Sequence, residues 1–303
     1  MLGPDQLREY LEHVQLSGKA LRPSLATLVT LHRQHAKCIP FSNITIAQGP
    51  TLLKELKFPH EIPDISPDGL IKKLVRRKWG GYCFESNSLL AEALVGLDFE
   101  VYCVAGRNLI ESPHCKAEQQ LIPSGFNHQV ILASVPAMPD TWYVVDAAFG
   151  SRSPLEPLAL REPEDAHASD ATHRLRRGFI GTTGTPSKQD LADRPQACGW
   201  YMQKYSETDR EWQDLYVFNE ANLALQRDFD VMNFYLAIRE GSIMRKDLII
   251  SVRNACGGQG RDTLLNTTLK VFGKDGMLVK DRELETAQDL RDALKTHFGI
   301  IPD

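Results

Sequence analysis

The sequence has no long apolar run and no excess of charge of one sign. Its 303 residues include 35 Lys and Arg against 39 Asp and Glu, and 42% of them are hydrophobic. A membrane-spanning helix needs about 20 consecutive apolar residues, and nucleic-acid-binding domains are usually basic. The first residues also lack a basic segment followed by an apolar stretch. We therefore expect a globular cytoplasmic protein that binds neither membranes nor nucleic acid.

The cysteines form no regular framework. The six cysteines include no Cys-x-x-Cys pair, which argues against disulfides and structural zinc in a chain of this size. His32 and His35 are three residues apart, but no cysteine or acidic partner stands at ligand spacing. We expect no metal site.

Apolar spacing divides the chain into three predicted domains. Residues 1–97 have a helical period. Residues 98–218 contain short apolar or alternating runs typical of strands, interrupted at about 160–198 by a long excursion of weak periodicity. Residues 219–303 mix both patterns and end in a helix that starts near Thr286.

Several element boundaries have clear signals. A helix is predicted to start at Ser66, because serine caps a helix and Pro67 and Asp68 suit its first turn. Another helix is predicted from Cys83. Strands are predicted at 101–105, 129–135, 141–146, 200–205 and 212–218, and a hairpin of 248–255 with 263–272 whose turn contains the glycine-rich 257–260.

Cys83 follows two glycines at the start of a predicted helix. Gly80 and Gly81 permit the backbone angles of a sharp helix entry. The first turn of a helix favours negative charge, and cysteine pKa values fall there from about 8.5 to roughly 3.5–7.5 when a cation helps. An isolated cysteine is more often a buried core thiol, so Cys83 becomes a candidate nucleophile only together with partners.

Such a nucleophile needs a base and a group that orients the base. His128 opens one predicted strand and Asp146 closes the next. A hairpin centred on Ala137 sets them opposite each other, with Cβ atoms roughly 4.5–5.5 Å apart. The order of Cys83, His128 and Asp146 leaves three chemistries open: a thiol protease, a transglutaminase-like amide exchange, and acyl transfer from a thioester.

Most of the chain resembles the arylamine N-acetyltransferase family. The matching stretches are Ile39-Pro40-Phe41-Ser42-Asn43-Ile44, Gly80-Gly81-Tyr82-Cys83-Phe84-Glu85-Ser86-Asn87, Asn127-His128, Val145-Asp146-Ala147-Ala148-Phe149-Gly150 and Asp228-Phe229-Asp230-Val231-Met232-Asn233. The resemblance implies that Cys83 accepts the acyl group, His128 is its base and Asp146 orients the base. It also implies an α+β fold with an N-terminal helical bundle, a middle antiparallel β-barrel and a C-terminal α/β lid around a cysteine-protease-like core.

The resemblance further implies a two-step reaction without a metal. The thiolate takes an acetyl, malonyl or propionyl group from acyl-CoA, with acetyl-CoA or malonyl-CoA as the expected co-substrate. A small aromatic amine, hydrazine or hydroxylamine is then acylated. Family members act on xenobiotics. Phe41, Phe149, Gly150 and Ser151 match positions near the acceptor and are the expected substrate-binding residues. The oligomeric state stays open.

Three residues near the nucleophile depart from the family pattern. Trp79 stands where the family has arginine, and Ser42 where it has glutamate. Because these two side chains pair in the family, their joint loss avoids a stranded buried charge, which costs several kcal/mol. Ala148 replaces a usual glycine, and its methyl group is expected to narrow the approach of CoA.

The region after Asn233 also lacks the family's Ser-Thr-x-Pro-like stretch. Here Arg239 or Arg245-Lys246 are candidates to meet a phosphate or a malonyl carboxylate, although solvated charges are commoner. Two other functions stay open. One is an amide synthase that releases a carrier-bound polyketide thioester, and the other is a catalytically silent CoA-binding member of the family.

Overall fold

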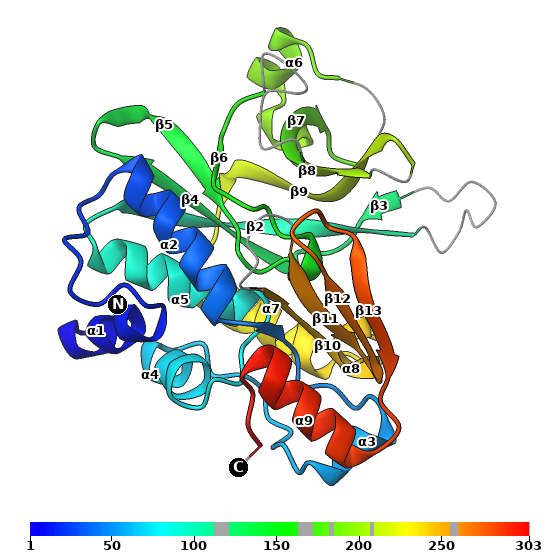
Figure 1. The fold of residues 1–303 in the computed structure, drawn as a ribbon. Coiled ribbons are helices and arrows are strands. Elements are labelled where there is room, and N and C mark those ends of the chain that lie inside the picture. The colour runs from blue at the N-terminus through cyan, green and yellow to red at the C-terminus, as the bar shows by residue number, and fades with distance from the viewer. Residues whose placement is uncertain (112–120, 163–171, 182–184, 207–208, 255–259, 303) are drawn as a thin grey trace.

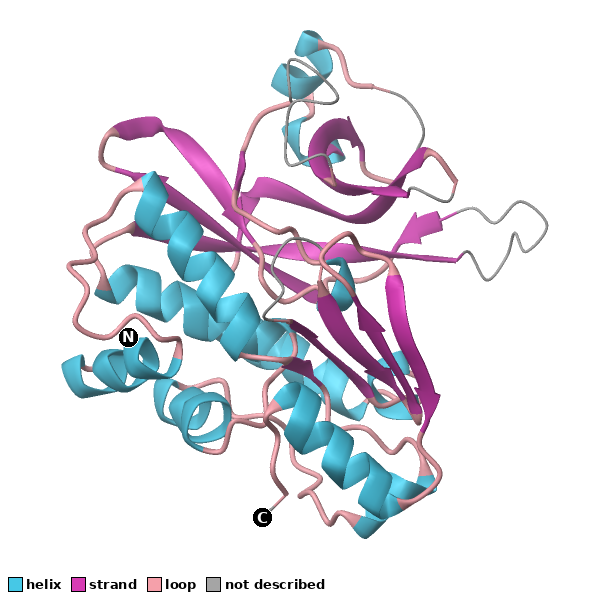
Figure 2. Cartoon of the chain, in the orientation of Figure 1, coloured by secondary structure: helices cyan, strands magenta, loops and turns pink. Residues whose placement is uncertain are grey.

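The computed structural model describes residues 1–111, 121–162, 172–181, 185–206, 209–254 and 260–302. Most helices from the first third lie together on one side of the strands, and two antiparallel sheets with further helices form the rest (Figures 1 and 2). Among the described residues, no helix combines the length and the apolar character needed to span a membrane.

The N-terminal helices carry the apolar faces that their spacing predicts. They are α1 (Pro4–His13), α2 (Leu25–Cys38), α3 (Thr51–Glu55), α4 (Pro67–Leu70) and α5 (Cys83–Gly96). The predicted start at Ser66 is confirmed, since its side chain accepts a hydrogen bond from the N–H of Gly69. Beyond α4 the helix widens into a π-helical turn over Ile71–Arg76.

The middle of the chain forms a curled antiparallel sheet. Its strands are β2 (Glu100–Glu111), β4 (His128–Val135), β5 (Met138–Val145), β6 (Leu158–Ala159), β7 (His173–Phe179), β8 (Cys198–Ser206) and β9 (Glu211–Leu223), with the short β3 (Leu121–Pro123) on β2. They lie in the order β6-β5-β4-β2-β9-β8-β7. Apolar side chains from seven of these strands, including Val104, Val130 and Tyr216, pack into one buried cluster.

The predicted excursion at 160–198 is partly wrong, because β7 lies within it and pairs with β8. In β7, arginines occupy positions where a typical strand has apolar residues. The sequence therefore lacks the apolar alternation that would predict a strand here. The arginine side chains cover aromatic rings of neighbouring strands, with Arg174 over Trp212, Arg176 over Tyr201 and Arg177 over Trp200. The aliphatic stems and guanidinium planes of arginine pack well against such rings.

The C-terminal part adds helices and a second sheet. Its elements are α7 (Gln226–Ile238), α8 (Ile243–Lys246), β10 (Ile249–Arg253), β11 (Arg261–Leu265), β12 (Thr268–Phe272), β13 (Leu278–Glu283) and α9 (Ala287–Phe298), while α6 (Lys188–Asp193) belongs to the middle part. The predicted strand 263–272 is in fact two strands, since Asn266 adopts a positive φ of 54° and turns the chain. Residues 255–259 of the predicted glycine-rich turn lie outside the described residues.

One strand of this second sheet comes from the first third of the chain. The sheet order is β1-β10-β11-β12-β13, and β1 (Phe41–Ser42) pairs with β10. Trp79 also packs in a cluster with side chains of α9, including Leu290 and Leu294. The segments before Cys83 are therefore held by residues from the end of the chain.

Candidate active site

The start of α5 is fixed by the glycines that precede it. Gly80 has a φ of +66°, and a Cβ atom there would lie 2.3 Å from the carbonyl oxygen of Pro40. Gly81 donates to Pro40 O at 3.1 Å and accepts from the N–H of Ser42 at 3.1 Å. Only glycine allows this close approach of two backbones. As a result α5 begins at Cys83, whose side chain is buried.

His128 and Asp146 form the partner pair that the sequence predicts. His128 Nε2 lies 2.9 Å from Asp146 Oδ2, and both side chains are buried. The predicted hairpin register is wrong, however. The turn is Pro136-Ala137 and Ile131 pairs with Val145, so Asp146 falls opposite Val130 rather than His128. An irregularity in the pairing between Ser134 and Val135 shifts the register of the hairpin. The sequence contains no signal for this irregularity.

The Asp146 carboxylate is held by two further donors. Asn87 Nδ2 donates to Oδ1 at 2.9 Å and also to the carbonyl of Gln129 at 2.8 Å, while the N–H of Ala148 donates to Oδ1 at 3.0 Å. Burial alone raises the pKa of Asp146, but His128 and these hydrogen bonds lower it to about 2. Sequence reasoning missed Asn87, although its spacing of four residues from Cys83 places both on one helix face.

His128 connects the carboxylate to the thiol. Burial lowers its pKa, but the charge of Asp146, its hydrogen bond and the contact with the Cys83 sulfur outweigh burial and raise the pKa to about 10. Cys83 Sγ also lies 3.8 Å from the carbonyl oxygen of Asn127. A protonated imidazole beside a sulfur atom favours the thiolate form.

An aromatic cluster packs around this imidazole. The ring centroids of His128, Phe149 and Tyr216 are 4.7 to 5.1 Å apart. Phe149, which was expected to lie near the acceptor amine, therefore packs against the imidazole ring of His128. Tyr216 was not predicted from the sequence, because it lies in β9, far from the recognisable motifs.

The other expected substrate-binding residues lie together in a small cavity. Phe41, Gly150 and Ser151 line it with Ser251 and Arg253. Its volume of about 10 Å³ holds roughly one water molecule. An aryl ring therefore enters this cavity only if side chains move.

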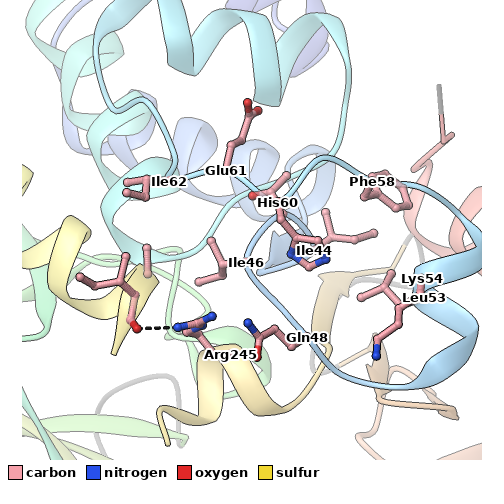
Figure 3. Close-up of a pocket in the computed structure, with 13 residues that line it drawn as sticks. Ile44, Ile46, Gln48, Leu53, Lys54, Phe58, His60, Glu61, Ile62 and Arg245 are labelled. Atoms are coloured by element: carbon pink, nitrogen blue, oxygen red, sulfur yellow. Dashed lines mark hydrogen bonds between the residues drawn. The ribbon is translucent and has the colours of Figure 1, made fainter. Parts of the chain in front are cut away.

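A larger cavity of about 600 Å³ is lined by residues of the segment 44–62 and of α7 and α8. Ile44 and Ile46 line it from the loop after β1, Phe58 from the segment after α3, and Arg245 from α8 (Figure 3). Arg245 donates to the carbonyl of Ile238. Arg239 instead lies over the exposed ring of Tyr235.

The three departures near the nucleophile are accommodated without an unpaired charge. Ser42 is buried, and its hydroxyl accepts from the N–H of Ile44. Trp79 is 1% exposed, and its indole N–H donates to the carbonyl of Ile301 at 2.9 Å. Ala148 is also 1% exposed and lies in the core. The expected effect of its methyl group on the approach of CoA stays a prediction.

No group of three or more His, Cys, Asp and Glu side chains that would suit a metal ion occurs among the residues with described positions. Cys38, Cys83, Cys103 and Cys198 are free thiols, while Cys115 and Cys256 lie outside the described residues.

Similarity to known proteins extends over nearly the whole chain. A family model described as N-acetyltransferase matches residues 24–301. An arylamine N-acetyltransferase of Mycolicibacterium smegmatis is 28% identical over 291 residues, which cover 96% of this chain and 90% of that protein. The N-malonyltransferase FDB2 of Gibberella moniliformis is 26% identical over 277 residues, covering 86% and 74%.

The solved structures agree with the predicted fold class. The arylamine N-acetyltransferase of Mycobacterium marinum in complex with CoA matches with a TM-score of 0.73 and 25% identity, covering 97% of this chain and 92% of that one. The expected α+β fold with a β-barrel sheet is confirmed.

Proposed function

Since the chain belongs to the arylamine N-acetyltransferase family, we propose that it transfers an acyl group from acyl-CoA to an aromatic amine through an acyl-Cys83 intermediate. The contact of Cys83 with His128, itself 2.9 Å from Asp146, carries this proposal. In this scheme Cys83 is the nucleophile, His128 the general base and acid, and Asp146 the orienting carboxylate.

The first step forms the thioester on the enzyme. His128 holds the proton of Cys83, and the thiolate attacks the carbonyl carbon of the acyl thioester. The bond from that carbon to the CoA sulfur breaks, and His128 returns the proton to the departing CoA thiolate. Asp146 stays ionised throughout, because its pKa of about 2 lies far below neutrality.

The second step transfers the acyl group to nitrogen. The amine attacks the carbonyl carbon of acyl-Cys83, and the carbon–sulfur bond breaks. His128 takes the proton that the amine loses, which regenerates the thiolate–imidazolium pair. A weakly basic aromatic amine is neutral at pH 7, so a reactive thioester and a nearby base both assist it.

The aryl ring of the acceptor is assigned to the surface beside Phe149. That side chain is partly exposed and contacts His128 edge to face at 5.1 Å. A ring stacked on it brings an attached nitrogen close to the imidazole. Phe41, Gly150 and Ser151 then form the neighbouring wall of the acceptor site. A larger aryl ring fits there only if side chains of this wall move.

The donor is proposed to be acetyl-CoA or malonyl-CoA. The Mycobacterium marinum structure contains CoA, and the Gibberella relative is named an N-malonyltransferase. Both donors present the same thioester to Cys83 and differ in the carboxylate of the malonyl group.

Intact-protein mass spectrometry tests the proposal directly. The protein is incubated separately with acetyl-CoA, malonyl-CoA and propionyl-CoA, without an amine. We expect one acyl group to be added to the wild type and none to Cys83→Ala, and subsequent aniline to remove it as the anilide. No mass gain and no release of CoA with any donor would contradict the proposal.

A further inference from the structure

A buried ion pair lies beside the first turn of α5. Lys73 Nζ is 2.6 Å from Glu85 Oε1, and the two side chains are 10% and 0% exposed. Taking two charges out of water is costly, and well-packed apolar residues often stabilise a fold equally well. The position of this pair, two residues from Cys83, points to a role in the reaction rather than in stability alone.

Glu85 connects the pair to the backbone that precedes the nucleophile. Its second oxygen, Oε2, accepts from the N–H of Tyr82 at 3.3 Å and so caps the start of α5. The side chain folds back over Gly81, where a Cβ atom would lie 2.7 Å from Glu85 Cβ. Glu85 therefore restrains the residue immediately before Cys83.

Lys73 connects Glu85 to two other segments. Its ammonium donates to Thr45 Oγ1 at 3.0 Å, in the loop after β1, and its carbonyl accepts from the N–H of Trp79 at 3.1 Å. It comes from the π-helical turn Ile71–Arg76, a form that occurs frequently at functional sites. One residue thus joins the loop after β1 and α5 through its side chain, and the segment before the nucleophile through its backbone carbonyl.

The charges of the pair also affect the sulfur. An ionised carboxylate two residues from a cysteine disfavours the thiolate form of that cysteine, unless a cation neutralises the carboxylate. Burial raises the pKa of Glu85, and the Lys73 ammonium opposes that rise. Lys73 therefore favours the ionised form of Glu85, which caps the helix, and offsets its charge near Cys83, although burial leaves the pKa of Glu85 raised overall.

We propose that Lys73 is a positioning residue for Cys83: its ammonium holds the Glu85 carboxylate against the N–H of Tyr82 and so fixes the first turn of α5, where Cys83 contacts His128. The proposal rests on the proposed function, in which Cys83 is the nucleophile. Lys73 itself touches neither the acyl group nor the amine in this scheme.

Alkylation of Cys83 by iodoacetamide tests this role without any acyl donor. The rate at Cys83 is followed by peptide mass spectrometry from about pH 5 to about pH 9. We expect Lys73→Met to slow alkylation near neutrality by about tenfold, the scale of coupling within one side-chain network. It should also add an ionisation to the pH profile, because Glu85 without its partner titrates closer to neutrality.

Matched variants separate this role from a general loss of stability. Lys73→Arg keeps the cation and should restore most of the rate, and Lys73→Met with Glu85→Gln should remove the added ionisation. Lys72→Met changes an exposed lysine of the same π-helical turn and should match the wild type. If Lys73→Met does not fold, Glu85→Gln alone should still slow alkylation, without an added ionisation.

Failure of the role of Lys73 and failure of the proposed function give different results in these experiments. A wild-type rate and pH profile in Lys73→Met, or a wild-type alkylation rate near neutrality in Glu85→Gln where that variant replaces it, would overturn the role of Lys73 even if the melting temperature falls. If instead wild-type Cys83 reacts no faster than a free thiol near neutrality, the proposed function fails, whatever the variants do.

Discussion

His128 reaches Asp146 diagonally across the hairpin of β4 and β5, with Nε2 2.9 Å from Oδ2, although Asp146 lies opposite Val130 in the register. Diagonal neighbours on a sheet are farther apart than opposed ones, so the contact needs the long imidazole side chain. Since Nε2 is used by Asp146, Nδ1 is the nitrogen left for Cys83.

Replacing Asp146 tests its role beside His128. In Asp146→Asn the charge that raises the pKa of His128 is lost, while burial still lowers it. We expect kcat for acyl transfer to fall by about 10³- to 10⁴-fold, as in other triads that lose this carboxylate. Alkylation of Cys83 near pH 6 should slow as well. A variant that turns over as fast as the wild type would contradict the assigned role.

Stability should depend on pH through the same pair. The folded pKa of His128, about 10, exceeds the unfolded value of about 6.5. Its stabilisation is therefore complete below about pH 6.5 and is lost as the pH rises towards about 10. Asp146 acts at the acidic end of the pH range. The stabilisation that it contributes to the fold is present above about pH 3.9 and is lost as the pH falls through about 2.

Urea denaturation measures this dependence. The free energy of unfolding of the wild type, relative to the double variant His128→Gln/Asp146→Asn, should be largest between about pH 4 and pH 6.5 and decrease steadily to about pH 10. A difference independent of pH over this range would show that the pair titrates alike in the folded and unfolded chains.

Gly80 should be far less tolerant than another glycine with the same backbone conformation. Gly80 and Gly18 have φ values of +66° and +72°, but a Cβ atom meets Pro40 O at 2.3 Å only in Gly80, while Gly18 has nothing within 4 Å. Gly18→Ala should cost about 1–2 kcal/mol of unfolding free energy from the left-handed backbone. Gly80→Ala should cost more and also slow Cys83 alkylation. Equal melting temperatures of the two variants would refute this.

Asn87 should matter through Asp146. Asn87→Ala removes one donor to the carboxylate and leaves the Gln129 carbonyl without its partner. We expect activity to fall by about tenfold, near the cost of one buried hydrogen bond to a charged group. The control is Ser88→Ala, which removes the neighbouring hydrogen bond to the Gln129 side chain and leaves Asp146 untouched. Equal losses in both variants would indicate a structural effect only.

Local signals in the sequence account for much of the fold. The cap at Ser66, the apolar face of α9 with Leu290 and Leu294, and β4 were all predictable, because each depends on residues close together in the chain. β7 and β13 were not. β7 has arginines in alternating positions, and β13 is exposed along its length, so neither has an apolar pattern.

The candidate site likewise contains some residues that the sequence predicts and others that it does not. Cys83, His128 and Asp146 were recognisable because they stand at the ends of regular elements, and the structure brings them together. Lys73 and Tyr216 were not, since their places depend on a π-helical turn and on the order of strands in the sheet. The small volume beside Phe41 and Ser151 likewise depends on side-chain packing between distant segments.

The hydrogen bond from Trp79 to the carbonyl of Ile301 has a consequence for synthesis on the ribosome. Trp79 immediately precedes the glycines of the nucleophile loop, and β1 beside them pairs with β10. Neither partner exists until the last third of the chain has been translated. The nucleophile loop of a nascent chain therefore lacks both contacts until β10, and then the C-terminal segment with Ile301, have been synthesised.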